Sequence, residues 1–520
     1  AVQSDQLPVL VKASAGGGGR GMRVVENLAE LPAQVTAARR EAHSAFGDST
    51  VFCERYLPRG RHIEVQVMAD QHGTVWAVGE RECSIQRRHQ KIIEEAPSPL
   101  VERIPGMRER LFDAARLAAT AIGYTGAGTV EFLADEAGEF YFLEMNTRLQ
   151  VEHPVTELTT GLDLVELQIS VADGEALPAE PPCAVGHSIE ARLYAEDPAR
   201  EWQPQAGRIH HVDVPGTLCE FGPLTTAGVR LDSGIVDGSV VSIYYDPMLA
   251  KVISYAPTRA RAAQVLAGAL AGTRLHGLRT NRDLLVNVLR HPAFLAGDTD
   301  TAFFDTHGLA DLAAPLADIG AVRLSAIAAT VADAARNRAR AKVLGAVPSG
   351  WRNVVSGNQH KSFRDGAGTE HGIAYRFTRG HLVLPDDPAV ELVSATPTEV
   401  VLTRDGVDTT FTVARYDDEV YVDSPLGPVA LVAVPRFPEP GSSVAKGSLL
   451  APMPGSVIRL GAALGDTVTA GQPLVWLEAM KMEHTIAAPA DGVLTQLDVV
   501  VGQQVEVGAV LARVEGEEQP

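Results

Sequence analysis

Cysteines and basic tracts are scarce in this chain of 520 residues. No uninterrupted apolar run approaches the roughly 18 residues that a membrane-spanning helix needs. The formal charge is −20 and no basic tract offsets it, which argues against a nucleic-acid binder. The cysteines are widely spaced, without a C-x-x-C pair, and predict reduced thiols of an intracellular protein and no disulfide framework. They are Cys53, Cys83, Cys183 and Cys219.

The length exceeds what one hydrophobic core supports, so we expect three or more domains. Apolar residues make up 45% and charged residues 21%, the usage of ordinary globular proteins. The chain begins at Ala1 and enters a buried-looking strand at residues 8–12. We therefore expect that an upstream segment is missing, so a targeting peptide cannot be assessed. Frequent Ala, Arg and Val suggest a bacterial gene, and we expect a cytoplasmic protein.

The tetrapeptide Ala479-Met480-Lys481-Met482 stands between two alternating apolar segments, at 473–478 and 483–487. Such a pattern predicts a tight hairpin with an exposed lysine at its tip. The surrounding sequence repeats, because Pro452 and Pro489, like Gly465 and Gly502, are 37 positions apart. Two copies of one strand–turn pattern predict a small β domain with quasi-twofold symmetry.

Residues 450–516 resemble a biotin carboxyl carrier domain, in which the lysine of Ala-Met-Lys-Met carries biotin. The resemblance implies that Lys481 is biotinylated by a biotin protein ligase. A plain surface lysine is the first alternative. A lipoyl domain is the second, although it usually has Asp-Lys-Ala at the tip.

A glycine run follows the first strand, with Lys12 just before it and Gly18 and Gly19 within it. Glycines let backbone N–H groups approach phosphate oxygens closely. The run has neither P-loop order nor the spacing of a dinucleotide fingerprint. It therefore predicts a phosphate-binding loop, with a flexible linker as the alternative.

A second polar constellation follows two apolar strands at 128–133 and 139–145. Glu131 and Glu144 converge if the two strands form a hairpin, and Asn146 lies on the same face as Glu144. Two carboxylates and an amide oxygen suit Mg²⁺. The sequence therefore predicts a magnesium or manganese site here, with solvated edge charges as the alternative. Arg148 follows as a candidate anion clamp, and Glu152 as a carboxylate base.

Residues 8–305 resemble the biotin carboxylases of the ATP-grasp family. The resemblance rests on ordered blocks of sequence at 12–22, 54–57, 61–64, 86–91, 94–97, 144–157 and 189–192. That family normally begins well before Ala1, with a pre-domain and one further ATP-contacting lysine.

The resemblance implies that Lys91, Arg148, Gln150, Val151 and Arg192 position bicarbonate and that Glu152 deprotonates it, with Lys91, Arg148, Glu152 and Arg192 as the catalytic set. It implies carboxyphosphate as the product of phosphoryl transfer, and an enolate-like biotin oxygen stabilised by Arg148. The implied metal ligands are Glu131, Glu144 and Asn146. The implied ATP contacts are Lys12, Gly18, Gly19, Met22, Glu54, Arg55, Leu57, His62, Gln86, His89 and Leu133. At Arg55 many relatives have lysine, which differs in geometry.

Residues 316–343 have apolar residues at helical spacing, and alternating strands follow at 399–403, 409–416 and 419–423. A helix followed by a small antiparallel β unit resembles the domain that joins biotin carboxylase to its carboxyltransferase partner in methylcrotonyl- and propionyl-CoA carboxylase α chains. A generic β insertion is the alternative. A Pro/Gly/Ser-rich linker follows and would tether a mobile carrier.

The fold class we expect is multidomain α/β and β. It comprises an N-terminally truncated ATP-grasp biotin carboxylase, a helix with a small antiparallel barrel-like domain, and a flattened biotinyl β-barrel. The expected boundaries are 1–182 for the partial ATP-grasp, 183–310 for the carboxylase C-terminal domain, 315–434 for the middle domain, 435–447 for the linker and 448–516 for the carrier.

These patterns predict the α subunit of a biotin-dependent acyl-CoA carboxylase, an ATP-dependent ligase that needs a separate carboxyltransferase β subunit. No carboxyltransferase domain of several hundred residues fits in this chain beside these parts, which disfavours pyruvate carboxylase. We expect 3-methylcrotonyl-CoA as substrate, with propionyl-CoA next. The alternatives are a non-catalytic carrier and assembly scaffold, and the α chain of an acetyl- or long-chain acyl-CoA carboxylase.

Overall fold

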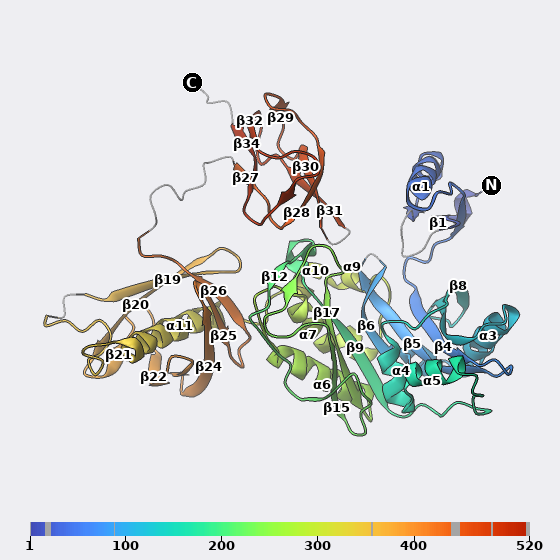
Figure 1. Ribbon diagram of the computed structural model, residues 1–520, viewed down its shortest axis with the longest axis horizontal. Helices are drawn as coiled ribbons and strands as arrows, with labels where there is room; N and C mark the ends of the chain where they lie inside the picture. Colours follow the sequence, from blue (N-terminus) through green and yellow to red (C-terminus); the bar gives the residue numbers. More distant parts are fainter. Residues whose placement is uncertain are drawn as a thin grey trace.

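The computed structural model describes residues 2–15, 22–87, 89–354, 357–437, 448–479 and 482–515. Figure 1 displays them as a small N-terminal lobe, a large central body, a middle domain built around one long helix, and a C-terminal β domain. Gly18, Gly19 and Lys481 lie outside the described residues, as does most of the predicted linker. None of the described helices is long and apolar enough to cross a membrane.

The N-terminal lobe is a three-stranded antiparallel sheet, in the order β2-β1-β3, covered by one helix. Val9, Val11 and Val25 from the sheet and Ala38 from the helix form its core. Glu54 pairs with Leu10 across the sheet, next to Lys12. The elements are η1 (Ser4–Gln6), β1 (Val9–Ala13), β2 (Arg23–Val25), α1 (Leu31–Phe46) and β3 (Val51–Arg55).

The central body is organised by one nine-stranded sheet, in the order β14-β15-β17-β9-β6-β5-β4-β7-β8. Its neighbouring strands are antiparallel except for β14 and β15. Pairing of β6 with β9 carries the sheet across the boundary expected at residue 182. The strands are β4 (Arg61–Ala69), β5 (Val75–Arg87), β6 (Gln90–Ala96), β7 (Gly126–Ala134), β8 (Phe140–Asn146), β9 (His187–Tyr194), β14 (Thr217–Glu220), β15 (Gly228–Ser233) and β17 (Met248–Ala256).

Helices cover both faces of this sheet, so β4 is buried along its whole length and does not alternate between core and solvent. On one face, Met107, Leu111 and Ala115 recur at helical spacing and pack with Ile63 and Val65. The helices are α2 (Pro99–Arg103), α3 (Met107–Ala121), α4 (His153–Thr160), α5 (Leu164–Ala172), α6 (Arg259–Gly272), α7 (Arg282–Arg290), α8 (Pro292–Ala296), α9 (Phe303–His307) and α10 (Leu309–Leu312).

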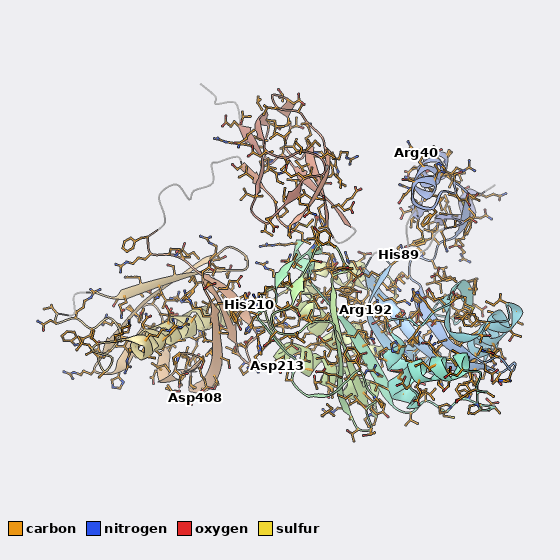
Figure 2. The ribbon with its side chains drawn as sticks, in the orientation of Figure 1. Arg40, His89, Arg192, His210, Asp213 and Asp408 are labelled. Atoms are coloured by element: carbon orange, nitrogen blue, oxygen red, sulfur yellow. The ribbon has the colours of Figure 1, made fainter. Side chains whose placement is uncertain are left out.

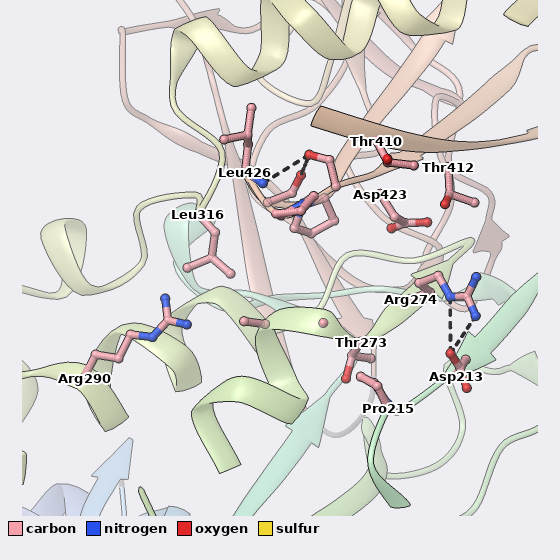
Figure 3. Close-up of a pocket in the computed structure, with 16 residues that line it drawn as sticks. Asp213, Pro215, Thr273, Arg274, Arg290, Leu316, Thr410, Thr412, Asp423 and Leu426 are labelled. Atoms are coloured by element: carbon pink, nitrogen blue, oxygen red, sulfur yellow. Dashed lines mark hydrogen bonds and ion pairs between the residues drawn. The ribbon is translucent and has the colours of Figure 1, made fainter. Parts of the chain in front are cut away.

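Short elements connect the larger ones at the C-terminal end of the body. They are β10 (Glu196–Asp197), η2 (Pro198–Arg200), β11 (Gln203–Pro204), β12 (Gly207–Arg208), β13 (His211–Asp213), β16 (Val240–Val241) and β18 (Arg274–His276). A cavity of about 570 Å³ lies between this end and the middle domain, lined by Arg274 and Arg290 on one side and Thr410 and Thr412 on the other (Figure 3). None of its lining residues belongs to the predicted site.

The middle domain wraps an eight-stranded antiparallel sheet around α11 (Ile319–Arg340), in the order β21-β20-β19-β26-β25-β24-β23-β22. Residues 324–334 of the helix are all buried, and five of these eleven are alanine, whose small side chains let the strands approach closely. The predicted helix and three strands are present, while β19–β22 and β26 were not predicted. The strands are β19 (Gln359–Asp365), β20 (Glu370–Thr378), β21 (His381–Val383), β22 (Val390–Ala395), β23 (Glu399–Arg404), β24 (Val407–Tyr416), β25 (Glu419–Asp423) and β26 (Val429–Ala433).

The C-terminal domain consists of two four-stranded antiparallel sheets, in the orders β27-β34-β32-β29 and β31-β30-β28-β33. Val457, Leu477, Leu494 and Leu511 contribute to one apolar core between them. The predicted flattened β-barrel is confirmed. Its strands are β27 (Ser448–Leu450), β28 (Gly455–Leu460), β29 (Thr467–Val468), β30 (Pro473–Ala479), β31 (Met482–Ala487), β32 (Gly492–Leu497), β33 (Gln504–Val505) and β34 (Val510–Glu515).

Candidate active site

Lys91, on β6, lies at the centre of a cluster of buried carboxylates. Its Nζ donates to Glu64 Oε2 at 2.5 Å, to Glu152 Oε1 at 2.5 Å and to Glu131 Oε1 at 3.0 Å. Desolvation lowers the pKa of Lys91, but the Glu64 and Glu152 charges outweigh it and raise that pKa well above its usual value. A buried ammonium paired in this way stays charged.

Glu152 is the N-cap residue of α4 and is 2% exposed. Besides Lys91, it accepts a hydrogen bond from Arg192 Nη2 at 2.9 Å through its second oxygen. Desolvation raises the pKa of Glu152, whereas Lys91 and Arg192 together hold it well below the usual range. Both oxygens of an ionised carboxylate are therefore held between two cations. Figure 2 places Arg192 on the central sheet.

Arg81, on β5, contacts Glu64 of this cluster and is fully buried. Its Nε donates to Glu64 Oε1 at 2.5 Å, and Nη1 donates to Gln66 Oε1 at 2.8 Å and Thr156 Oγ1 at 3.0 Å. The contact of Arg81 with Glu64 is fully buried, and the contacts of Lys91 are partly buried. Buried charges persist only when they are paired and hydrogen-bonded in this manner.

The three predicted metal ligands come together on β7 and β8. Glu131 and Glu144 are directly paired across the two strands. Asn146 Nδ2 lies 3.0 Å from Glu131 Oε1 and 3.3 Å from Glu144 Oε1. The oxygen and nitrogen of such an amide exchange on a simple flip, which would present an oxygen beside both carboxylates. This donor set fits Mg²⁺, a hard cation that prefers oxygen ligands.

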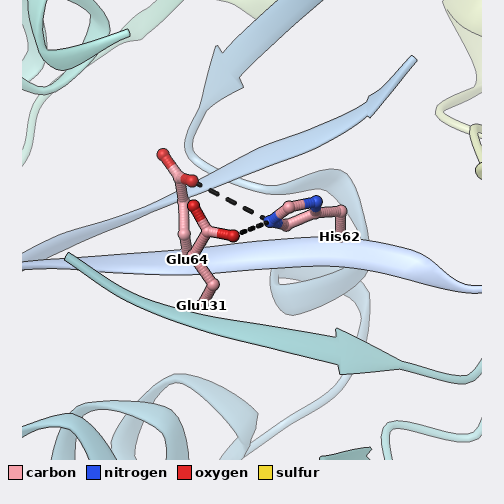
Figure 4. Close-up of side chains that lie close together, drawn as sticks. All are labelled: His62, Glu64 and Glu131. Atoms are coloured by element: carbon pink, nitrogen blue, oxygen red, sulfur yellow. Dashed lines mark ion pairs between the residues drawn. The ribbon is translucent and has the colours of Figure 1, made fainter. Parts of the chain in front are cut away.

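His62, Glu64 and Glu131 form a second cluster of possible metal donors (Figure 4). His62 Nε2 lies 3.1 Å from Glu131 Oε2 and 4.0 Å from Glu64 Oε2. The Lys91 ammonium contacts both carboxylates, so it already supplies the positive charge there. This arrangement disfavours a second cation at this position.

The predicted ATP contacts are divided between the N-terminal lobe and the central sheet. Lys12 Nζ forms an ion pair with Glu54 Oε1 at 2.9 Å, and His62 Nδ1 lies 2.7 Å from Gln86 Nε2. His89, labelled in Figure 2, has a positive φ of 67°. Desolvation lowers the pKa of His89, and the His62 and Lys12 charges add to this, so residues from both lobes influence one site.

The remaining predicted ATP contacts lie at separate positions in the two parts of the site. Leu133 stands opposite His62 on the next strand, and its side chain covers Gly60, where a Cβ would meet Leu133 at 2.5 Å. Leu57 is half-buried and Arg55 is exposed. Met22 is described but lies outside any strand. The neighbouring predicted contacts, Gly18 and Gly19, fall outside the described residues.

The bicarbonate set converges next to the metal ligands. Gln150 donates to Glu131 Oε1 at 2.8 Å, and the Val151 carbonyl accepts from Lys251 Nζ at 2.9 Å. Arg148 is exposed and reaches Asn146 Oδ1 at 3.4 Å. The structure thus brings Lys91, Gln150, Val151, Glu152 and Arg192 into one cluster and leaves Arg148 at its open edge.

Sequence reasoning did not select four residues that support this cluster: Glu64, Arg81, Glu94 and Lys251. Glu64 and Glu94 stood in the sequence blocks of the resemblance but were given no role. Lys251 lies about 100 residues beyond Val151 and contacts it only because α4 packs against β17. An isolated lysine or arginine in a strand carries no signal of its own, apart from the rarity of buried charge in β-strands.

In the carrier domain, Ala479 pairs with Met482 at the end of the β30–β31 hairpin. The connection between the two strands is therefore the pair Met480-Lys481, which lies outside the described residues.

Four family models match successive parts of the chain. Residues 1–180 match "Carbamoyl-phosphate synthase L chain, ATP binding domain" and residues 190–306 match "Biotin carboxylase C-terminal domain". Residues 322–436 match "Methylcrotonyl-CoA carboxylase, alpha-subunit, BT domain". Residues 447–514 match "Biotin-requiring enzyme".

Similar proteins align with nearly the whole chain. The mitochondrial methylcrotonoyl-CoA carboxylase subunit alpha of Dictyostelium discoideum is 37% identical over 540 residues, which cover 97% of this chain and 74% of that protein. The propionyl-CoA carboxylase alpha chain of Ruegeria pomeroyi is 38% identical over 544 residues, which cover 98% of this chain and 78% of that protein.

Solved structures resemble the carboxylase part. The biotin carboxylase domain of Hydrogenobacter thermophilus 2-oxoglutarate carboxylase, in complex with MgADP, ADP and bicarbonate, has a TM-score of 0.54 and 43% identity over 58% of this chain. The chain spans 64% of the length of that structure. A Campylobacter jejuni biotin carboxylase–nucleotide complex has a TM-score of 0.54 and 44% identity, over 58% of this chain and 65% of that one. The four matched models and the aligned relatives together establish that this chain belongs to the α subunits of biotin-dependent acyl-CoA carboxylases.

Proposed function

We propose that this chain uses ATP and bicarbonate to carboxylate a biotin on Lys481, as an ATP-dependent ligase. The observation that carries the proposal is the position of Glu152, whose two carboxylate oxygens contact Lys91 and Arg192 in a buried site. The two cations can hold an anionic substrate beside this carboxylate, which then lies in position to accept a proton from it.

The predicted cofactors are confirmed by the comparisons: biotin, ATP and Mg²⁺. When bound, ATP and Mg²⁺ supply an activated phosphoryl group with its charge neutralised, and biotin supplies the atom that takes up the carboxyl group. We propose Glu131, Glu144 and Asn146 as metal ligands. We propose as ATP contacts Lys12, Gly18, Gly19, Met22, Glu54, Arg55, Leu57, His62, Gln86, His89 and Leu133.

For bicarbonate we propose Lys91, Arg148, Arg192, Gln150 and the backbone of Val151 as contacts, with Glu152 as the base. Bicarbonate becomes a better nucleophile when it loses its proton. The low pKa of Glu152 keeps it ionised but makes it a weak base while both cations contact it. Because bicarbonate also attracts Lys91 and Arg192, its binding draws these cations away from Glu152 and strengthens the base.

The α subunits of this family work with a carboxyltransferase β subunit. We propose that residues 315–434 contact that subunit in a large α/β assembly, that residues 435–447 tether the carrier, and that a biotin protein ligase modifies Lys481. The support is the match of residues 322–436 to the BT domain model. We propose the bacterial cytoplasm as the compartment.

Among acyl-CoA substrates we propose 3-methylcrotonyl-CoA first and propionyl-CoA second. The match of the middle domain to a methylcrotonyl-CoA carboxylase domain favours this order, whereas relatives of both kinds are about equally similar, at 37% and 38% identity. The test is to purify the chain with the β subunit that assembles with it and to compare turnover on both thioesters. Faster turnover of propionyl-CoA or acetyl-CoA would overturn this order.

The ligase itself is tested by bicarbonate-dependent ATP hydrolysis in the presence of free biotin. We expect turnover that requires bicarbonate, Mg²⁺ and biotin together. A folded, biotinylated protein without such turnover would instead support a carrier and assembly scaffold.

A further inference from the structure

Two carboxyl groups lie behind Arg192 in the centre of the sheet. Glu94 on β6 and Glu190 on β9 are directly paired in the register of the two strands, and both are 0% exposed. Glu94 Oε1 accepts from Arg192 Nε at 2.5 Å. Among the described residues, neither oxygen of Glu190 nor Glu94 Oε2 has a hydrogen-bond partner. Three buried carboxyl oxygens without partners are unusual and costly.

The charges around this pair cannot neutralise two carboxylates. Arg192 stands on the same strand as Glu190, Lys251 lies on the neighbouring β17, and the anionic Glu152 caps α4. Lys251 Nζ forms an ion pair with Asp232 Oδ2 at 3.1 Å and donates a hydrogen bond to the Val151 carbonyl at 2.9 Å. Arg192 also contacts Glu152.

Burial raises the pKa of Glu190 well above its usual value, and the Glu94 charge adds to this against the opposing effect of Lys251. Burial likewise raises the pKa of Glu94 to about 7, although Arg192 opposes it. Lys91 also lowers the pKa of Glu94, and Glu152 raises it. Two neighbouring carboxyl groups in a dry site cannot both ionise.

We propose that Glu94 and Glu190 form a buried carboxyl pair that shares one proton and carries a single negative charge, and that this pair positions Arg192 against Glu152. The strand pairing places the two carboxyl groups side by side, and one of them carries the proton. The pair then acts as one anion behind Arg192, whose other face holds the catalytic base. Glu94 and Glu190 are positioning residues that do not touch substrate.

The shared proton has a spectroscopic signature that does not depend on activity. Infrared spectra of the full chain at pH 7.5 should contain a carbonyl-stretch band of a protonated carboxylic acid, which ionised surface carboxylates do not give. Burial also raises the pKa of Glu95 and of Glu157, so the Glu190→Gln variant should lose the part of that band which the pair contributes. If the wild-type spectrum contained no such band, the proposal would be overturned. An unchanged band in a folded Glu190→Gln protein would overturn it as well.

A double-mutant cycle on bicarbonate-dependent ATP hydrolysis tests the positioning role, which rests on the proposed function. Glutamine mimics a neutral acid, so Glu190→Gln should lower kcat by no more than about threefold. In Glu94→Gln, Glu190 can ionise in place of Glu94, so we expect a loss of about tenfold. The double variant has no anion behind Arg192 and should lose about tenfold more than the product of the two single losses.

The pH dependence of ATP hydrolysis distinguishes the positioning role of the pair from a purely structural effect of the substitutions. In Glu94→Gln, activity depends on ionisation of Glu190, so the acidic limb of the profile should move to higher pH. The double variant should lose this dependence. Additive losses, or equal losses in the two single variants, would overturn the shared proton. A wild-type protein without any such ATP hydrolysis would refute the proposed function, while the infrared comparison would still decide this inference.

Discussion

The carboxylase body and the carrier domain achieve stability in opposite ways. The body buries Arg61, Arg81, Glu64, Glu82 and Glu94 with almost no exposure. In the described parts of the carrier, residues 448–479 and 482–515, no charged or polar side chain is buried, and the core is aliphatic. Buried ion pairs rarely stabilise a fold better than apolar packing does. We infer that the buried charges around Lys91 and Glu152 are retained for chemistry, whereas the described part of the carrier is held by apolar packing alone.

The largest expected effect concerns the carrier. Lys481→Arg removes the amine that biotin is attached to, because a guanidinium does not form that amide. We expect complete loss of avidin binding and of acyl-CoA carboxylation, while ATP hydrolysis with free biotin is unchanged. Streptavidin blotting and the two activity assays measure this. Loss of the free-biotin reaction in a folded variant would contradict the separation of the two regions.

The next effect concerns the base in the body. Glu152→Gln keeps the shape of the side chain but cannot accept a proton, so turnover should fall about 100- to 10,000-fold. The dissociation constant for ATP should stay within about threefold, since Glu152 contacts no proposed ATP residue. Steady-state kinetics and calorimetry measure the two quantities. Glu166→Gln on the exposed face of α5 is the matched control, and equal effects on turnover and ATP affinity would reject Glu152 as base.

Replacement of Arg81 tests whether the buried charges depend on one another. Arg81→Met leaves Glu64 buried beside one cation fewer, so the body should lose about 3–5 kcal/mol of unfolding free energy. Arg116→Met removes a surface ion pair with Asp113 and should cost less than about 1 kcal/mol. Urea unfolding monitors both. A cost as small for Arg81 as for Arg116 would mean that the buried network is not structurally required.

The smallest expected effect is a pH dependence confined to the body. Burial lowers the pKa of His153 to about 4, and the Lys251 charge adds to this, against a usual value of 6.5. The unfolded chain therefore binds the proton first, and stability is lost as pH falls from about 6.5 to about 4. The loss from this residue should be about 2 kcal/mol at pH 5.

His153→Asn provides the control, since an amide can donate to the Gln150 carbonyl as His153 does without titrating. The difference in unfolding free energy between pH 7 and pH 5 should shrink in this variant. An undiminished difference would place the pH sensitivity elsewhere in the body.

The sequence predicts best those features that depend on neighbours along the chain. The hairpin around Lys481 follows from local alternation, and the pairing of Glu131 with Glu144 follows from one turn between two apolar strands. The buried network could not be predicted in this way. Glu64, Lys91 and Arg192 stand on β4, β6 and β9, and only the order of the strands brings them together.

The middle domain also combines a feature that local sequence predicts with features that depend on distant segments. The alanines of α11 predict a helix, but their number reflects strands that close around it, and those strands come later in the chain. Short strands such as β21 (His381–Val383) carry too few residues to show a period of two.

One measurement tests the central claim, that a buried carboxylating site and its biotin carrier belong to one chain. The full chain, made in a host that contains biotin protein ligase, is incubated with ATP, Mg²⁺ and labelled bicarbonate. We expect acid-labile label on the biotinylated protein, dependent on ATP and blocked by avidin. A chain whose intact mass shows residue 481 unmodified, or a biotinylated chain that hydrolyses ATP but takes up no label, would contradict the claim.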